Sequence, residues 1–343
     1  MGRNMGTEER VQFCCKICEG SETSGSYEAR EMMFGLRTPF HYTQCANCGS
    51  LWLMDPPHDF GVYYPNGYYS LASRNGGMKA AIIEYLRAKR DRTYFGSRDV
   101  LGRFLSWRYK NSDLRAVSKL NAKPDTRVLD VGCGSGQLLH RMAALGFKNL
   151  VGADPYLSND FQNGNGVRIR KCRLEDMVGE KYGLVMFHHS LEHVPDPVGT
   201  LRTVARMLAP GGKCLVRLPV VAHAWERYKT NWVQLDPPRH MWLPTEKAMG
   251  ILAESAGLSM QGVDYDSTDF QFWGSELYAR DVPLLDLPSR GVPLRGVSFY
   301  YANSVDLTGR FRREEVAEFQ RKAVTLNREG QGDQAAFYFS GKP

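Results

Sequence analysis

From about residue 127 onward, short runs of apolar residues alternate with longer stretches in which apolar residues recur at helical spacing. The first pattern is typical of buried strands and the second of amphipathic helices, so the alternation predicts an α/β fold around a largely parallel sheet. We expect strands at 128–131, 148–154, 167–169, 182–187, 258–266 and 335–340, and helices at 245–256 and 313–326. The stretch 208–216 predicts a turn that leads into a further strand, the fifth along the chain.

The first 123 residues lack this alternation and divide into two parts. Residues 1–70 contain two cysteine pairs and then an aromatic cluster at 63–69, which either lines a substrate mouth or packs this part against the rest. Residues 71–123 predict one or two helices. The α/β domain is expected to span 124–343, with an insertion at about 267–334 before its last strand. That insertion would cover the active site or make a homodimer contact.

The loop after the first predicted strand carries the most specific motif. It reads D-x-G-x-G-x-G, with the residues Asp130, Gly132, Gly134 and Gly136. Glycine tolerates strained backbone conformations and a close ligand, and the helix that follows presents unpaired N–H groups at its start. A dinucleotide fingerprint would read G-x-G-x-x-G, but Gln137 stands where its last glycine would be. A nicotinamide- or sugar-binding Rossmann domain is therefore the less favoured alternative.

This loop resembles the first motif of class I S-adenosylmethionine (SAM) dependent methyltransferases. The stretches LEHVPDP at 191–197 and LAPGGK at 208–213 are similar to later motifs of the same superfamily. The resemblance implies a Rossmann-like sheet of seven strands, preceded here by a small N-terminal unit and helical additions. It also implies that Asp130 and the three glycines frame the methionine end of SAM.

Further acids follow the next predicted strands. Asp154 ends the second strand, where a carboxylate can accept hydrogen bonds from both ribose hydroxyls. Glu175 or Asp176, after the third strand, is expected to accept from the adenine amino group. His188 ends the fourth strand, at the edge that faces the cofactor crevice.

Five of the eight cysteines lie near the N-terminus. Cys15 and Cys18 form one C-x-x-C pair and Cys45 and Cys48 another, a spacing that predicts a four-thiolate zinc ribbon with a structural role. Iron is a rival metal for four thiolates, and a redox role for either pair stays open. A disulfide is less favoured because no secretory leader is recognisable. Cys14 is left over from this pairing.

Histidines near the fourth strand are the candidates for a general base, because their pKa lies near working pH. Methyl transfer from SAM depends mostly on positioning, so such a base is not always required. His189 is the preferred candidate. His193 is either a second base or a residue that caps and packs the turn.

A second group of candidates follows the fifth strand, in the stretch 232–242. Trp232 could stack on an acceptor ring, Arg239 could clamp a phosphate or carboxylate, and His240 could act as a base. This stretch, with a helix behind it and a C-x-x-C ribbon ahead, resembles a branch of small-molecule methyltransferases. Members of that branch, sugar methyltransferases included, occur with surface-polysaccharide and secondary-metabolite pathways.

The LEHVPDP run is also shared with ubiquinone-type O-methyltransferases, which carry an acid at the position of His189. In those enzymes the acids and a histidine hold a divalent metal at the substrate. Here only Glu192 and His193 remain, so Glu192 is expected near the substrate but the sequence does not favour metal-assisted methylation.

Positive charge is concentrated in the helical segment. Residues 78–123 contain twelve Lys or Arg against four Asp or Glu, whereas the whole chain has a net charge of +7. Such a segment attracts anionic partners, among them a nucleotide- or lipid-phosphate-linked substrate, a membrane surface or RNA; a plain solvated helix face is the alternative.

The sequence therefore predicts a SAM-dependent methyltransferase that modifies a small, anionic, sugar- or nucleotide-linked acceptor, on oxygen in preference to carbon. The alternatives are an RNA or protein methyltransferase that grips its target with the ribbon and basic helices, and a non-catalytic SAM-binding scaffold. Nucleic acid is not favoured, because no Asn-Pro-Pro-Tyr-type motif follows the fourth strand. Without a leader or a transmembrane-length apolar stretch, the expected location is the cytoplasm.

Overall fold

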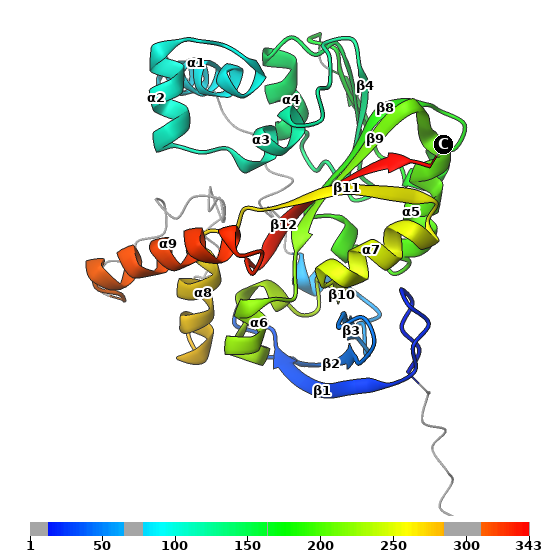
Figure 1. Cartoon of the computed structure of the whole chain (residues 1–343), viewed down its shortest axis with the longest axis vertical. Helices are drawn as coiled ribbons and strands as arrows, with labels where there is room; N and C mark the ends of the chain where they lie inside the picture. The colour runs from blue at the N-terminus through cyan, green and yellow to red at the C-terminus, as the bar shows by residue number, and fades with distance from the viewer. Residues whose placement is uncertain (1–12, 65–77, 163, 285–309, 343) are drawn as a thin grey trace, which may run out of the picture.

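A mixed sheet of eight strands lies at the centre of the molecule in a computed structural model that describes residues 13–64, 78–162, 164–284 and 310–342 (Figure 1). The strand order is β11-β12-β9-β8-β4-β5-β7-β6. Neighbours from β9 to β7 run parallel, while β12 is antiparallel to both β9 and β11. The strands are β4 (Arg127–Val131), β5 (Asn149–Ala153), β6 (Phe161–Gln162), β7 (Val167–Arg170), β8 (Tyr182–His188), β9 (Leu208–Pro219), β11 (Leu258–Tyr265) and β12 (Gln334–Gly341).

All seven strands predicted from the apolar runs are present, but the expected count of seven is wrong by one in the described part of the chain. The additional strand β6 has two exposed residues and lies at the edge of the sheet, where it pairs with β7. Because it buries nothing, it leaves no apolar pattern in the sequence.

Helices cover both faces of this sheet. One buried cluster joins Leu129 and Val185 in the sheet to Leu201 of α5 (Pro197–Met207) and Leu252 of α7 (Glu246–Ser255). On the other face, a second cluster joins the sheet to α3 (Ser112–Ser118) and α4 (Gln137–Ala144). The chain thus forms the three-layer α/β architecture that the sequence predicts.

The N-terminal unit is a second, four-stranded sheet with the order β1-β2-β3-β10. Its strands are β1 (Thr23–Arg30), β2 (Pro39–Cys45), β3 (Leu51–Leu53) and β10 (Trp242–Leu243). The last strand comes from the α/β part of the chain, and it places Trp242 opposite Trp52 with the two rings stacked at 5.8 Å. The expected boundary at residue 70 therefore does not separate two independent folding units.

The basic segment contains three α-helices instead of the expected one or two: α1 (Met78–Arg92), α2 (Val100–Arg108) and α3. α1 and α2 pack on each other at the end of the molecule opposite the N-terminal sheet (Figure 1). An ion pair of 2.7 Å between Asp91 and Arg141 of α4 ties this helical pair to the α/β part.

The expected insertion contributes α8 (Phe270–Ala279) and α9 (Arg313–Arg328), which pack on each other. Residues 285–309 of it lie outside the described part. The remaining helical elements are α6 (His223–Tyr228), η1 (Gly61–Tyr63), η3 (Thr93–Phe95), η4 (Leu174–Met177), η5 (Leu191–His193), η6 (Lys229–Asn231) and η7 (Val233–Leu235). Among the described helices, none combines the length and the apolar character needed to cross a membrane.

Candidate functional site

A cavity of about 2940 Å³ opens at the carboxyl ends of the parallel strands. Its lining includes the loops that follow β4, β5, β7 and β8, together with residues of α3, the segment after β9 and the segment after β11. Ligands of open α/β sheets bind at this edge, because the strand ends and helix starts present their backbone groups there.

The glycine loop after β4 forms one wall of the cavity. Gly132 and Gly136 have φ values of +74° and +73°, which residues with a Cβ atom rarely adopt. A Cβ at Gly132 would lie 2.4 Å from Cβ of Ser190, and one at Gly136 would lie 2.0 Å from Cδ1 of Ile169. Glycine is therefore required at both positions, by backbone conformation as well as by space.

Asp154 holds this loop in place. Its carboxylate accepts hydrogen bonds from the backbone N–H of Gly134 and of Tyr156, both at 2.9 Å. The side chain reaches the cavity from the end of β5, the position expected for a ribose-binding acid. The loop and the acid, predicted separately from sequence, form one connected structure.

Asp130 also faces the cavity from the end of β4 and is almost fully buried. Burial, together with the nearby carboxylates of Asp113 and Asp154, raises the pKa of Asp130 to about 8. A positively charged ligand in the cavity would favour the ionised form of this carboxyl.

The two acids expected at the adenine differ in position. Glu175 lines the cavity, whereas Asp176 uses its carboxylate to accept the backbone N–H of Arg173 at 2.9 Å and so caps η4. Of the two, Glu175 is the one placed to contact a ligand. His188 lines the cavity as well, and burial lowers its pKa to about 4, so the ring is neutral. Neither of its ring nitrogens has a hydrogen-bond partner among the described residues.

His189, the preferred base from sequence, has its ring engaged on both sides. Its Nε2 lies 2.8 Å from a guanidinium nitrogen of Arg217, and because arginine can only donate, Nε2 is the acceptor. Its Nδ1 then carries the proton and lies 3.5 Å from Glu192. The expectation that His189 is the base is thus wrong for this arrangement, because its lone pair already accepts a hydrogen bond.

Arg217 and its carboxylate partners were missed from the sequence. This buried arginine of β9 pairs with Asp266 at 2.7 Å and Asp113 at 3.1 Å. A charged residue inside the otherwise apolar run 214–219 was the available signal, since a buried charge requires partners. The two carboxylates come from distant parts of the chain, so the sequence did not identify them.

The rings of His193 and His240 lie next to each other and close to Glu192, with their centroids 5.0 Å apart. Nδ1 of His193 lies 2.7 Å from the carbonyl of Arg239, and Nδ1 of His240 lies 2.7 Å from that of Gln234. Because a carbonyl only accepts, each Nδ1 carries the proton and each Nε2 keeps its lone pair. Both rings line the cavity.

Glu192 is fully buried beneath these rings, and neither of its carboxylate oxygens has a hydrogen-bond partner among the described residues. Burial opposes its ionisation, but the contact with His189 and the nearby His193 and His240 outweigh this effect and lower its pKa to about 2. One ligand atom from each of Glu192, His193 and His240 lies within 4.8 Å of the others. His240 thus supplies a third candidate metal ligand, which the sequence did not reveal.

Two expected substrate contacts are corrected by the structure. The guanidinium of Arg239 is fully buried and pairs with Glu31 at 2.9 Å and with Asp236. It therefore joins the stretch 232–242, which we call the acceptor loop, to the N-terminal unit and does not clamp an anion. Trp232 is fully buried, and its indole N–H donates to Asp333 at 3.0 Å. It is a packing residue, because no face of its ring is left for an acceptor.

The two described residues of the aromatic cluster at 63–69 lie in different surroundings. Tyr63 packs edge-on against Phe40 of the N-terminal sheet. Tyr64 lines the cavity, stacks on Tyr156 and lies 3.4 Å from Nδ1 of His193. The rest of the cluster, from residue 65, lies outside the described residues.

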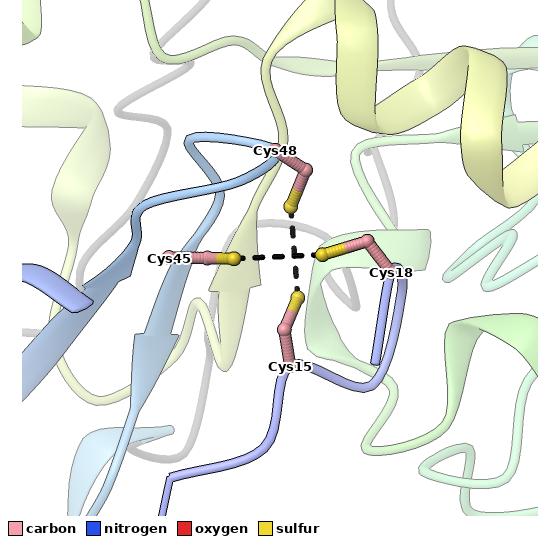
Figure 2. Close-up of side chains that lie close together, drawn as sticks. All are labelled: Cys15, Cys18, Cys45 and Cys48. Atoms are coloured by element: carbon pink, nitrogen blue, oxygen red, sulfur yellow. Dashed lines mark hydrogen bonds between the residues drawn. The ribbon is translucent and has the colours of Figure 1, made fainter. Parts of the chain in front are cut away.

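The four cysteines of the C-x-x-C pairs converge with their sulfur atoms pointing at a common centre (Figure 2). The Sγ atoms of Cys15 and Cys48 are 3.6 Å apart, and those of Cys18 and Cys45 are 3.5 Å apart. A tetrahedral zinc ion with Zn–S bonds of about 2.3 Å requires edges of about 3.8 Å, so the four thiols have the spacing of such a site. Cys14 is exposed and lies outside this group.

Residues 101–262 match the methyltransferase domain family. The chain contains a SAM-dependent methyltransferase domain. Over 155 residues it is 41% identical to a ubiquinone biosynthesis O-methyltransferase of Nitrosospira multiformis, which covers 40% of this chain and 64% of that protein. A protein of the same name from Caulobacter sp. is 33% identical over 150 residues, covering 38% and 58%. The chain thus spans about six-tenths of the length of these relatives.

Two solved structures resemble this chain in part of its backbone. The first is a chain of the complex between the Haloferax volcanii Trm112 methyltransferase activator and a putative methyltransferase. It has a TM-score of 0.45 and 15% identity, and the match covers 74% of this chain and 98% of that one. A SAM-dependent methyltransferase from Mesorhizobium loti has a TM-score of 0.40 and 15% identity, covering 67% and 98%.

Proposed function

We propose that the protein transfers the methyl group of SAM to an oxygen of a small-molecule acceptor. One observation carries this proposal: a single cavity is lined by the glycine loop, by Asp154 and by the histidines above Glu192. The relatives are O-methyltransferases of ubiquinone biosynthesis, which favours an oxygen acceptor and lends no support to a sugar- or nucleotide-linked one. Arg239 pairs with the buried Glu31, so this arginine no longer argues for an anionic acceptor.

The cofactor end of the cavity would hold SAM, which supplies an electrophilic methyl group on its sulfonium. The close-packed glycine loop lets the methionine end approach the backbone, and Asp130 places a carboxyl beside that end. Asp154 would bind the ribose and Glu175 the adenine. His188, neutral and without a hydrogen-bond partner in the described structure, would complete the cofactor site.

His240 is the proposed base. Its proton on Nδ1 is fixed by the carbonyl of Gln234, which leaves Nε2 free to accept the proton of the acceptor hydroxyl. The acceptor oxygen would take the methyl group as the S–CH3 bond of SAM breaks and S-adenosylhomocysteine leaves. The resulting imidazolium is stabilised by Glu192, whose carboxylate lies 3.9 Å from the same Nε2. His193, held by a matching contact to a backbone carbonyl, would orient the acceptor beside it.

A second role for this cluster is favoured by Glu192, a buried carboxylate with neither oxygen hydrogen-bonded in the described structure. The Nε2 atoms of His193 and His240 and the carboxylate of Glu192 form a donor set typical of a divalent metal. In metal sites, a carbonyl commonly accepts the Nδ1 proton of a histidine ligand and so fixes the orientation of its ring; the two backbone carbonyls here make that contact. A cation there would stabilise the charge that develops on the acceptor oxygen.

Zinc in the four-cysteine group is proposed as structural. The spacing of the thiols fits the ion, and the unit they belong to reaches the cavity through Tyr64 and the Glu31–Arg239 pair. Metal binding would stabilise the fold of this unit and hence the position of the acceptor loop.

The test is turnover with labelled SAM and phenolic and hydroxylated acceptors, using Asp154→Ala, His240→Ala and the exposed-residue control His58→Ala. We expect Asp154→Ala to lose S-adenosylhomocysteine binding, and His240→Ala to keep binding but lose turnover by about 10²-fold or more. Binding that is unchanged in Asp154→Ala would refute the cofactor site. Transfer of label from SAM to RNA or protein, and not to small molecules, would replace the proposed class of acceptor. Binding of S-adenosylhomocysteine without methyl transfer to any acceptor would indicate a scaffold.

Metal content separates the two roles of the cluster. If it holds a cation, elemental analysis gives a second equivalent besides that of the cysteines, and Glu192→Gln removes only the second. If a single equivalent is found and is lost only with Cys48→Ser, the metal role is refuted and the base role stands.

A further inference from the structure

One face of α2 exposes large apolar side chains at the end of the molecule that carries α1 and α2 (Figure 1). The side chains of Val100, Phe104 and Trp107 are 82%, 57% and 72% exposed. The Phe104 and Trp107 rings lie 6.0 Å apart, so the exposed groups form one continuous ridge. We call these three residues the α2 ridge.

The ridge points away from the rest of the helical pair. Gly102 is the position of α2 that meets α1, because a Cβ there would lie 2.5 Å from the backbone oxygen of Lys89. At about 100° per residue, the three ridge residues lie about 140–160° around the helix from Gly102. No described element of this chain therefore covers the ridge, although removing such large apolar side chains from water is favourable.

Arginines flank the ridge on both sides. By the same helical geometry, Arg103 lies about 100° from Gly102 in one direction and Arg108 about 120° in the other. Both side chains are exposed. The surrounding segment, residues 78–123, has twelve Lys or Arg against four acids. The surface thus combines an apolar ridge, an interfacial tryptophan and a basic border.

We propose that the α2 ridge docks the protein on a bilayer that contains anionic phospholipids. Aromatic and aliphatic side chains enter the headgroup boundary, while the arginines pair with lipid phosphates. Charge complementarity favours an anionic lipid surface over an apolar protein surface, because arginines border the ridge and the segment 78–123 has an excess of Lys and Arg over acids. Arg87 of α1 and Lys110, just after α2, also line the cavity, so docking would place the cavity mouth close to the lipid surface. The proposal does not depend on the methyl acceptor.

The fluorescence of Trp107 can report on contact between the ridge and a membrane. Of its six tryptophans, five are at most 5% exposed, and Trp107 alone is open to solvent. With vesicles of equal parts phosphatidylcholine and phosphatidylglycerol, we expect a saturable blue shift of the tryptophan emission and co-sedimentation of the whole protein. Vesicles of phosphatidylcholine alone should give a much smaller effect, and ionic strength near 1 M, where the Debye length is about 3 Å, should weaken the contact.

Three variants make the test specific. Val100→Ser/Phe104→Ser should abolish the emission shift, and Arg103→Gln/Arg108→Gln should weaken binding to anionic vesicles by roughly 30-fold. Val178→Ser, which changes an exposed apolar residue elsewhere, is the matched control and should bind as the unchanged protein does.

Two results would overturn the proposal. The first is the absence of both shift and co-sedimentation with anionic vesicles while the protein remains folded by circular dichroism. The second is a concentration-dependent doubling of mass, without vesicles, that Val100→Ser/Phe104→Ser removes; the ridge would then be an interface between two copies of the chain.

Discussion

Replacing Asp130 by asparagine tests whether a buried acid at the cofactor site is protonated in the folded protein. The pKa of this carboxyl rises from 3.8 to about 8 on folding, because it is buried beside other carboxylates. Between these two values the folded protein holds a proton that the unfolded chain has released. The free energy of unfolding therefore falls as the pH rises from about 4 to about 8, and the contribution is fully present only below the lower value.

The size of the effect follows from the shift. One proton difference changes the free energy of unfolding by about 1.4 kcal/mol per pH unit, which gives about 2.7 kcal/mol between about pH 5 and pH 7. Asparagine cannot ionise, so Asp130→Asn escapes this loss. The stability of the variant minus that of the unchanged protein should thus increase by about 2.7 kcal/mol over this range, whatever other groups titrate in both proteins.

Urea unfolding at both pH values, followed by circular dichroism, measures this difference. Asp125→Asn, at an exposed carboxylate just before β4, is the matched control for the change of acid to amide. If the Asp130→Asn difference is instead constant, Asp130 is ionised in the folded protein, and the reasoning from burial and neighbouring acids is refuted.

Three further perturbations test the packing around the site. Gly132→Ala should abolish S-adenosylhomocysteine binding in calorimetry, because its Cβ would overlap Ser190; unchanged affinity would show that the loop relaxes. Arg239→Ala leaves the buried carboxylate of Glu31 without its cation, so denaturant unfolding should show a loss of about 3–5 kcal/mol, and a loss under about 1 kcal/mol would contradict the buried pairing. Cys48→Ser should lose bound zinc and lower the melting temperature, as a chelator does, whereas Cys14→Ser, outside the cluster, should retain both; equal zinc in the two would refute the four-thiolate site.

The parts of the fold that follow from neighbouring residues were predicted well. Each apolar run predicted a strand, because burial on both faces of a parallel sheet leaves a continuous apolar stretch in the sequence. The strand β6 and the split of the basic segment into three helices were not predicted, because exposed or short elements bury too few side chains to leave a period.

The candidate site was predicted unevenly for the same reason. The glycine loop and Asp154 lie together at the strand ends, as their place in the sequence predicts, since a strand, a turn and a helix start follow one another directly along the chain. The roles of His189 and Arg239 were not predicted, because each depends on a partner that is remote in sequence: Arg217 for the first and Glu31 for the second.

The sequence by itself determined the α/β order, the glycine loop at the first strand end and the pairing of the four cysteines, because these depend on local spacing and periodicity. Only the tertiary structure brought His240 to Glu192 and joined β10 to the N-terminal sheet. Only it showed that the cations of the acceptor loop and of β9 are neutralised inside the protein. Such choices rest on which distant charges and apolar faces meet when the chain is compact, and a linear pattern of residues does not contain those distances.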